Sequence, residues 1–140
     1  MERVSTPSPS CRLTRRYSLS ALHQLGRPEL TAQDNTQHFL HCEKLHGHEY
    51  SVEVTYSGPI DPLSGLCIKR ETLDELVQEK ILSVFHGKNL SELLPYTSGE
   101  FLAREFLKRL RQDSRGKNIQ LLAIQETKKN RFIAEAKNLG

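Results

Sequence analysis

Apolar and polar residues alternate along two stretches in the first half of the chain, and this pattern predicts two β-strands. In residues 12–24, one face carries every second residue from Leu13 to His23. In residues 46–57, one face carries His46, His48, Tyr50, Val52, Val54 and Tyr56. Because successive side chains of a strand point to opposite sides of a sheet, each stretch presents one face to a core.

A different period follows and predicts two helices, over residues 70–85 and 98–112. Apolar residues recur there every three or four positions, as on one side of an α-helix. The two stripes are Leu73, Leu76, Val77, Ile81 and Phe85, then Ala103, Phe106, Leu107 and Leu110. The start of the second helix fits a capping box, with Thr97 as N-cap and Glu100 at N3.

Two more strands, residues 118–127 and 131–137, are expected to close the chain as a hairpin. The order β-β-α-α-β-β predicts an α+β domain, in which two helices cover one face of a four-stranded antiparallel sheet. We expect this single domain to span residues 12–140. Residues 1–11, rich in Ser and Pro, are predicted to be a disordered N-terminal lead.

Composition narrows the class of protein. The 140 residues are 26% charged and 36% hydrophobic, as in a soluble globular chain. No apolar run approaches the ~20 residues of a membrane span, and the N-terminus has no apolar core of a signal peptide. A net charge of +3 with scattered basic residues does not predict nucleic-acid binding. Three cysteines without framework spacing indicate free thiols in a cytoplasmic protein.

Five of the six histidines lie between His23 and His48. His46 and His48 share a strand face, and His23 ends the apolar face of the preceding strand. If the two strands are antiparallel neighbours, the three imidazoles meet at one end of the sheet. Three protein ligands with one open position form a catalytic zinc site. Surface histidines or hydrogen-bonded core histidines are the alternative, and the spacing alone leaves both open.

The connection over residues 25–45 is long for neighbouring strands, and we expect it to be irregular and functional. It carries His38 and His41, interpreted as loop residues, and Cys42. Cys42 has three interpretations that the residues leave open. It is a fourth ligand of a closed structural zinc, a thiolate acting as base or nucleophile, or a buried small apolar residue.

Five segments form an ordered set of motifs: "LSALH" (19–23), "CEKLHGHEY" (42–50), "GPIDPLSGLCI" (58–68), "TSGEFLA" (97–103) and "IQETKKN" (124–130). Together they resemble the family of 6-pyruvoyl-tetrahydropterin synthase and 6-carboxy-tetrahydropterin synthase. The most specific match is the Cys-x-x-x-His-Gly-His element with a preceding Ala-x-His. Leu19 stands where the family usually has Phe.

The resemblance implies a tunnelling fold (T-fold), whose subunits assemble around a β-barrel, commonly as homohexamers. It implies Zn²⁺ on His23, His46 and His48. The implied substrate is 7,8-dihydroneopterin triphosphate, a pterin. Cys42 then matches the catalytic cysteine, which takes a proton as a thiolate. Glu126 matches the glutamate that anchors the pterin, and Glu100, in the matching helix start, is a second expected substrate-binding residue.

The three-residue spacer between Cys42 and His46 resembles the bacterial queuosine-pathway branch. The resemblance therefore favours a lyase that forms 6-carboxy-5,6,7,8-tetrahydropterin. The alternative is the 6-pyruvoyl-tetrahydropterin synthase reaction, which eliminates triphosphate.

One motif departs from the family. Where the family has an Asp-His pair that assists the cysteine, "FHGKNL" (85–90) places His86 and Gly87. His86 is either a catalytic acid–base residue or a cation at a helix C-terminus with Gly87 as left-handed cap. Two further hypotheses follow: a relative that binds zinc and pterin with lost or altered activity, and a non-enzymatic module with a closed zinc site of one cysteine and three histidines.

Overall fold

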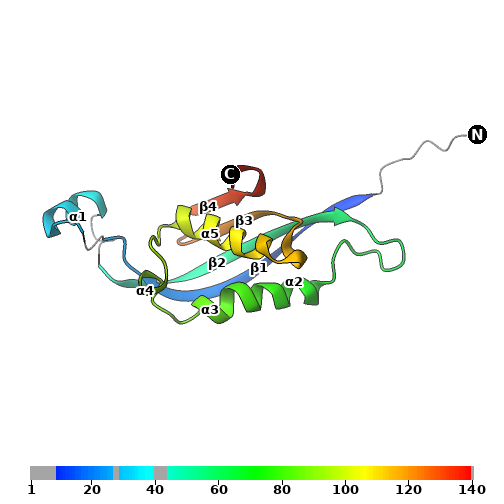
Figure 1. Cartoon of the computed structure of the whole chain (residues 1–140), viewed down its shortest axis with the longest axis horizontal. Helices are drawn as coiled ribbons and strands as arrows, with labels where there is room; N and C mark the ends of the chain where they lie inside the picture. Colours follow the sequence, from blue (N-terminus) through cyan, green and yellow to red (C-terminus); the bar gives the residue numbers. More distant parts are fainter. Residues whose placement is uncertain (1–8, 27–28, 40–43, 140) are drawn as a thin grey trace, which may run out of the picture.

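The computed structural model describes residues 9–26, 29–39 and 44–139 (Figure 1). The strands are β1 (Ser10–His23), β2 (His46–Pro59), β3 (Ile119–Gln125) and β4 (Arg131–Glu135). The α-helices are α1 (Ala32–Phe39), α2 (Arg70–Val77), α3 (Ser83–Phe85), α4 (Leu90–Leu93) and α5 (Gly99–Gln112). A π-helical turn spans Gln78–Leu82, and 3-10 turns span Ser114–Gly116 and Ala136–Asn138.

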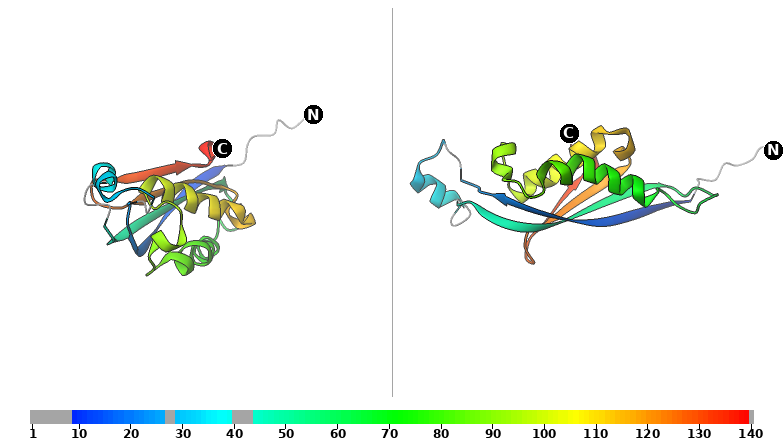
Figure 2. Two further views of the ribbon diagram at one scale, coloured as in Figure 1. Left: turned by 60° about the vertical axis from the view of Figure 1, so that its left-hand side comes forward. Right: turned by 90° about the horizontal axis from the view of Figure 1, so that it is seen from below.

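The four strands form one antiparallel sheet in the order β1-β2-β3-β4. Helices α2, α3 and α5 lie against one face of it, as the turned views make plain (Figure 2). The predicted α+β fold, with its helical segments on one face of the sheet, is therefore confirmed. The long β1–β2 hairpin pairs in register from Ser10 opposite Pro59 to His23 opposite His46.

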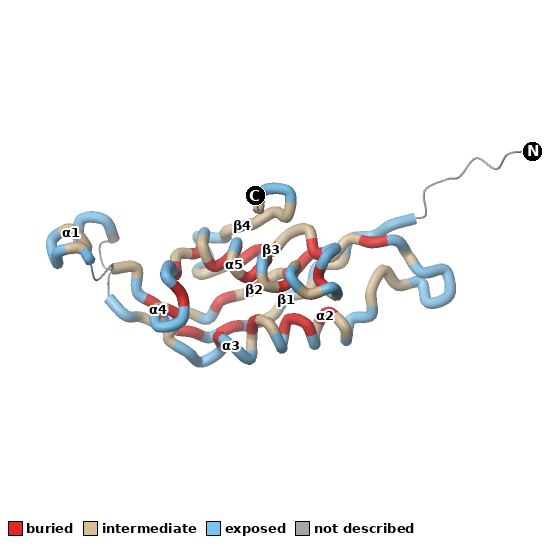
Figure 3. Tube along the Cα trace, viewed as in Figure 1, coloured by how far each residue is buried: buried red, intermediate tan, exposed pale blue. Residues whose placement is uncertain are grey.

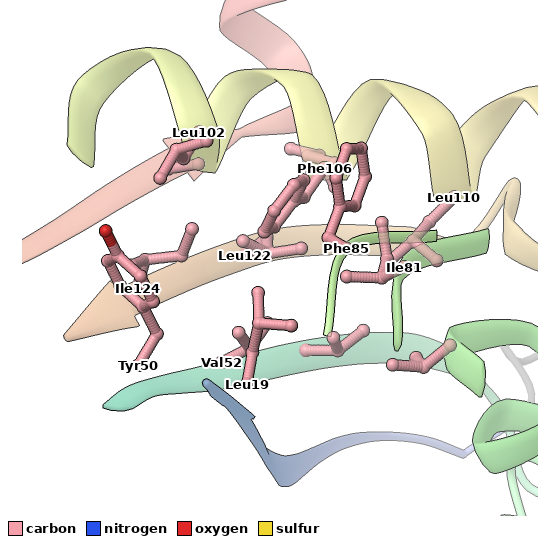
Figure 4. Packing of buried hydrophobic residues seen from close by; sticks show 14 of the residues in the cluster. Leu19, Tyr50, Val52, Ile81, Phe85, Leu102, Phe106, Leu110, Leu122 and Ile124 are labelled. Carbon is pink, nitrogen blue, oxygen red and sulfur yellow. The ribbon is translucent and has the colours of Figure 1, made fainter. Parts of the chain in front are cut away.

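The core lies between the sheet and these helices (Figures 3 and 4). Both predicted helical stripes are buried in full, and Leu102 joins the second. The Phe85 and Phe106 rings stack across the two helices with centroids 5.1 Å apart. From the sheet, Leu19, Tyr50 and Val52 enter the same core, as their alternation predicts.

The first predicted helix is continuous over residues 70–85, but its middle turn is π-helical. Val77, Ile81 and Phe85 are spaced by four residues, which is more than the 3.6 residues of an α-helical turn. The wider turn at Gln78–Leu82 absorbs this excess. All three side chains therefore stay on the buried side.

The predicted capping box is wrong. The N-cap of α5 is Ser98, whose hydroxyl accepts a hydrogen bond from the Phe101 N–H at 3.3 Å. Thr97 is buried instead, and its hydroxyl donates to the Gln24 carbonyl oxygen at 3.1 Å. Thr97 therefore bonds to the residue that follows β1, and Ser98 is the N-cap of α5.

The connection between β1 and β2 is also more regular than expected, because α1 occupies Ala32–Phe39. The Thr31 hydroxyl accepts from the Asp34 N–H at 3.1 Å and so caps this helix. At the N-terminus, β1 already begins at Ser10, within the predicted lead. Residues 1–8 of that lead lie outside the described residues. No helix in the described part of the chain is long and apolar enough to cross a membrane.

Candidate metal centre

Three histidines from two strands meet at one end of the sheet. His23 is the last residue of β1 and stands directly opposite His46, the first residue of β2. His48 lies two positions further along β2 and points to the same side. The antiparallel register therefore brings together the three imidazoles, as the sequence predicts.

The rings surround a common point. Their centroids are 4.5 Å apart for His23 and His46, 5.0 Å for His23 and His48, and 4.7 Å for His46 and His48. Each pair meets edge to face, at interplanar angles of 68°, 76° and 86°. The Nε2 atoms of His23 and His46 face one another at 2.9 Å.

Backbone carbonyls hold two of these rings from behind. His23 Nδ1 lies 2.8 Å from the Thr97 carbonyl oxygen, and His46 Nδ1 lies 2.7 Å from that of Lys44. A carbonyl only accepts, so each Nδ1 carries the proton in this network and each Nε2 presents a lone pair. Metal-ligating histidines are oriented in this way by their second nitrogen.

Glu126 completes the cluster. It directly follows the last residue of β3, and its Oε1 atom lies 2.9 Å from His48 Nε2 and 3.4 Å from His23 Nε2. One donor atom from each histidine and one carboxylate oxygen lie within 4.8 Å of one another. The pKa of Glu126 is below its usual value, chiefly through the His23 side chain, although His48 is the closer of the two. The group is therefore a carboxylate at neutral pH.

The donor set fits a metal ion. Two Nε2 lone pairs that face one another at 2.9 Å repel unless a cation, either a proton or a metal ion, lies between them. His48 Nε2 is buried and makes no hydrogen bond within the described structure, because its contact with Glu126 lacks hydrogen-bond geometry. Burial lowers the pKa of His48, which favours the neutral imidazole that metals bind. Neutral imidazoles with a carboxylate are typical zinc ligands.

Tyr50 belongs to the surroundings of this site, although the sequence pattern places it only in the core. Its ring centroid lies 5.5 Å from that of His48 and 6.0 Å from that of His23. The side chain is 1% exposed, and its hydroxyl has no hydrogen-bond partner in the part of the chain that the structure describes. The signal available in the sequence was its position, two residues after His48 on the same strand face.

His86 stands apart from the four-residue cluster. It is exposed, and its Nδ1 accepts a hydrogen bond from the Ser20 N–H on β1 at 3.2 Å. Gly87 has a left-handed φ of 75°, as the helix-end interpretation predicts. The Gly87 N–H then donates to the Ser20 carbonyl oxygen at 2.7 Å. The segment after α3 is thereby fastened to β1, and a catalytic role for His86 stays a prediction.

The remaining expected site residues are not in the cluster. Glu100 lies in the first turn of α5 and lines a groove between α5 and β4, beside Arg104, Arg131 and Phe132. Its predicted role in substrate binding stays a prediction. Cys42 lies outside the described residues, so its three interpretations stay open.

Comparison with known proteins points in one direction. The family model described as 6-pyruvoyl tetrahydropterin synthase matches residues 12–137. A relative from Drosophila melanogaster named 6-pyruvoyl tetrahydrobiopterin synthase is 37% identical over 90 residues, which are 63% of this chain and 54% of that protein. A human relative of the same name is 36% identical over 86 residues, 60% of this chain and 59% of that protein. The matches thus span less than two thirds of these relatives.

Solved structures agree in fold. The 6-pyruvoyl tetrahydropterin synthase of Caenorhabditis elegans superposes with a TM-score of 0.87 at 25% identity, covering 94% of this chain and 99% of that one. The protein of the same name from Plasmodium falciparum gives a TM-score of 0.65 at 16% identity, covering 89% of this chain and 96% of that one. The second likeness concerns the fold alone.

Proposed function

The chain belongs to the 6-pyruvoyl tetrahydropterin synthase family, and from this membership we propose that it is a zinc-dependent lyase acting on 7,8-dihydroneopterin triphosphate. The proposed reaction eliminates triphosphate and forms 6-pyruvoyl-tetrahydropterin. The observation that carries the proposal is the convergence of His23, His46 and His48, whose donor atoms lie within 4.8 Å of one another. The names of the matched relatives favour this product over the 6-carboxy product.

His23, His46 and His48 would hold a zinc ion, which when bound would supply Lewis-acid stabilisation of negative charge on the substrate. The residues of the protein orient the metal ligands and move the proton. The Thr97 and Lys44 carbonyls keep the His23 and His46 rings in one tautomer. Cys42, separated from His46 by three residues, is assigned as the base that takes a proton from the substrate side chain while triphosphate leaves with its bonding electron pair.

The carboxylates are assigned to the pterin ring. A pterin presents an N–H and an amino group side by side, and a carboxylate accepts from both, as it does from a guanidinium. Glu126 is the proposed anchor and Glu100 a second contact. The proposed active form is a homohexamer, which the family resemblance implies. Within the described sheet, β4 and the part of β1 before Ser20 have an edge without a neighbouring strand, and this edge is available to another subunit.

A second candidate product is 6-carboxy-5,6,7,8-tetrahydropterin, which the three-residue spacer after Cys42 favours. Altered activity is the third candidate, because His86 and Gly87 stand where the family has an Asp-His pair.

Product analysis separates the three candidates. The purified, zinc-loaded protein is incubated with 7,8-dihydroneopterin triphosphate, and the products are identified by mass. We expect 6-pyruvoyl-tetrahydropterin and triphosphate. Release of 6-carboxy-tetrahydropterin with acetaldehyde would support the second candidate, and bound pterin without turnover would support the third. As controls, His48→Ala should lose zinc and turnover, whereas Cys42→Ala should lose turnover and keep zinc.

His86 is tested separately. General acid–base assistance is worth roughly 10²–10⁴-fold in rate, so His86→Asn should lower turnover within that range if the imidazole relays protons. Zinc content and pterin affinity should not change. Unchanged turnover would leave His86 as the residue that ends α3 and accepts from the Ser20 N–H.

A further inference from the structure

The position of Glu126 has a consequence for the metal site itself. A residue that only anchors a pterin would direct its carboxylate toward the ring-binding space. Here the carboxylate lies among the imidazoles, 2.9 Å from His48 Nε2 and 3.4 Å from His23 Nε2. Within the described residues it is the only carboxylate in the cluster.

The distances match those of one four-coordinate ion. Zinc binds imidazole nitrogen and carboxylate oxygen at ~2.0–2.2 Å, so the donors of a tetrahedral site lie about 3.4 Å from one another. The separations here run from 2.9 Å, between His23 Nε2 and His46 Nε2, up to the 4.8 Å limit of the cluster. The distances of the Glu126 carboxylate oxygen, 2.9 Å to His48 Nε2 and 3.4 Å to His23 Nε2, lie near the tetrahedral value. The carboxylate therefore occupies the place of a fourth ligand, the position that a catalytic zinc site leaves open.

Glu126 lies where β3 ends and an exposed turn begins. It is the first residue beyond β3, and its backbone N–H donates to the Asn130 carbonyl oxygen at 3.3 Å across the turn to β4. Residues 127–130 of this turn are exposed. The Glu126 side chain itself is 15% exposed, so it lies at the border between the cluster and solvent.

We propose that Glu126 is the fourth metal ligand of the ligand-free protein and that an incoming ligand oxygen displaces it. The carboxylate then acts as a gate: it closes the metal site at rest, and on release it becomes available to accept from the N–H groups of the bound molecule. The identity of that molecule as a pterin rests on the proposed function. The closed resting site does not, because it follows from the positions of the four donors.

The test uses cobalt-substituted protein and azide, with no substrate. The zinc-free protein is loaded with Co²⁺, and azide binding is followed by visible absorption. In the unmodified protein the carboxylate should compete with azide. Glu126→Gln should therefore bind azide about 10-fold more tightly or better, and should bind Co²⁺ at least about 10-fold more weakly, because one anionic ligand is lost.

Glu49→Gln is the matched control. Glu49 is the neighbour of His48 on β2, is exposed, and points to the opposite face, so the same charge is removed without touching the site. This variant should bind Co²⁺ and azide as the unmodified protein does. Glu126→Asp, which keeps the charge on a side chain shorter by one methylene, should fall between the unmodified protein and Glu126→Gln, and it serves if the latter fails to fold.

Equal Co²⁺ and azide affinities in the unmodified protein and in both Glu126 variants would overturn the gate. This outcome is distinct from failure of the proposed function, which is measured by turnover. A protein that binds azide only after Glu126 is changed, yet never converts the pterin, would support the gate and refute the lyase.

Discussion

The Tyr50 hydroxyl is buried beside His48, and it has no hydrogen-bond partner in the described structure. A buried polar group left unpaired costs about 1–3 kcal/mol. Burial also raises the pKa of Tyr50, so the hydroxyl keeps its proton at neutral pH and remains a donor. At the scale of single residues, this site therefore retains a group that weakens the ligand-free fold and is available to a ligand.

Tyr50→Phe should raise the free energy of unfolding of the ligand-free protein by about 1 kcal/mol, because it removes only the unpaired hydroxyl. Urea unfolding measures this, with metal content checked in parallel. Tyr17→Phe is the control of opposite sign, since the Tyr17 hydroxyl donates to Asp74 at 2.6 Å and its loss should destabilise. A less stable Tyr50→Phe protein would show that the hydroxyl is paired in solution.

At the scale of elements, one ion-pair network fastens the outer strand β1 to helix α2. Arg15 donates from Nε and Nη2 to the two Asp74 carboxylate oxygens at 2.8 and 2.9 Å, and Tyr17 donates to one of them. A bidentate pair of this kind has specific geometry. The Arg15 hydrogen bonds are the main cause that lowers the pKa of Asp74 below its usual value.

This shift predicts the direction of a pH effect. The folded pKa of Asp74 lies below the unfolded value of about 3.9, so the network stabilises the protein above that pH and the contribution is lost as the pH falls through the folded value. Asp74→Asn should cost about 1 kcal/mol at pH 7, since the pair is partly exposed. The difference in the free energy of unfolding between the unmodified protein and Asp74→Asn should become smaller as the pH falls from 7 to 3.

Urea unfolding of both proteins at several pH values measures this narrowing. Glu75→Gln, one residue away on the exposed side of α2, should change stability little at any pH. If the difference in the free energy of unfolding between the unmodified protein and Asp74→Asn stayed constant from pH 7 to pH 3, the lowered pKa of Asp74 would be contradicted.

At the scale of the whole molecule, the outer strand β4 carries an exposed apolar residue. Phe132 and Ala134 pack against the core, so Ile133 between them points away from the helices and is 55% exposed. Exposed apolar side chains on an edge strand are unfavourable in a monomer and typical of a surface that another chain covers. This agrees with the proposed assembly.

Ile133→Lys should therefore reduce the assembly to smaller species, because a charge would be buried between subunits. Light scattering coupled to gel filtration measures the mass, and circular dichroism checks the fold. Leu63→Lys is the matched control, since Leu63 is 95% exposed in the turn after β2. An Ile133→Lys protein of unchanged mass would exclude this face from the interface.

Local patterns in the sequence determined the four strands and the two long helical segments of this fold, and three members of its site. Alternation along residues 46–57 and the four-residue spacing of Val77, Ile81 and Phe85 are properties of neighbouring residues, so they are visible without a structure. The same alternation places His46 and His48 on one face. His23 follows once the two strands are paired, because an antiparallel hairpin brings its ends together.

Contacts between distant segments were decided only by the tertiary structure. Thr97 does not cap α5, because its hydroxyl donates to the Gln24 carbonyl oxygen just after β1. The Ser98 hydroxyl caps the helix instead. Glu126 reaches the histidines only because β3 pairs with β2 in a register that ends with Gln125 opposite Ser51, so the next side chain along β3 extends to His48. Tyr50 lacks a partner only in its packed surroundings. The period of apolar residues along the sequence indicates which face of a strand or helix a side chain lies on. The residues that it contacts on that face depend on strand register and on packing.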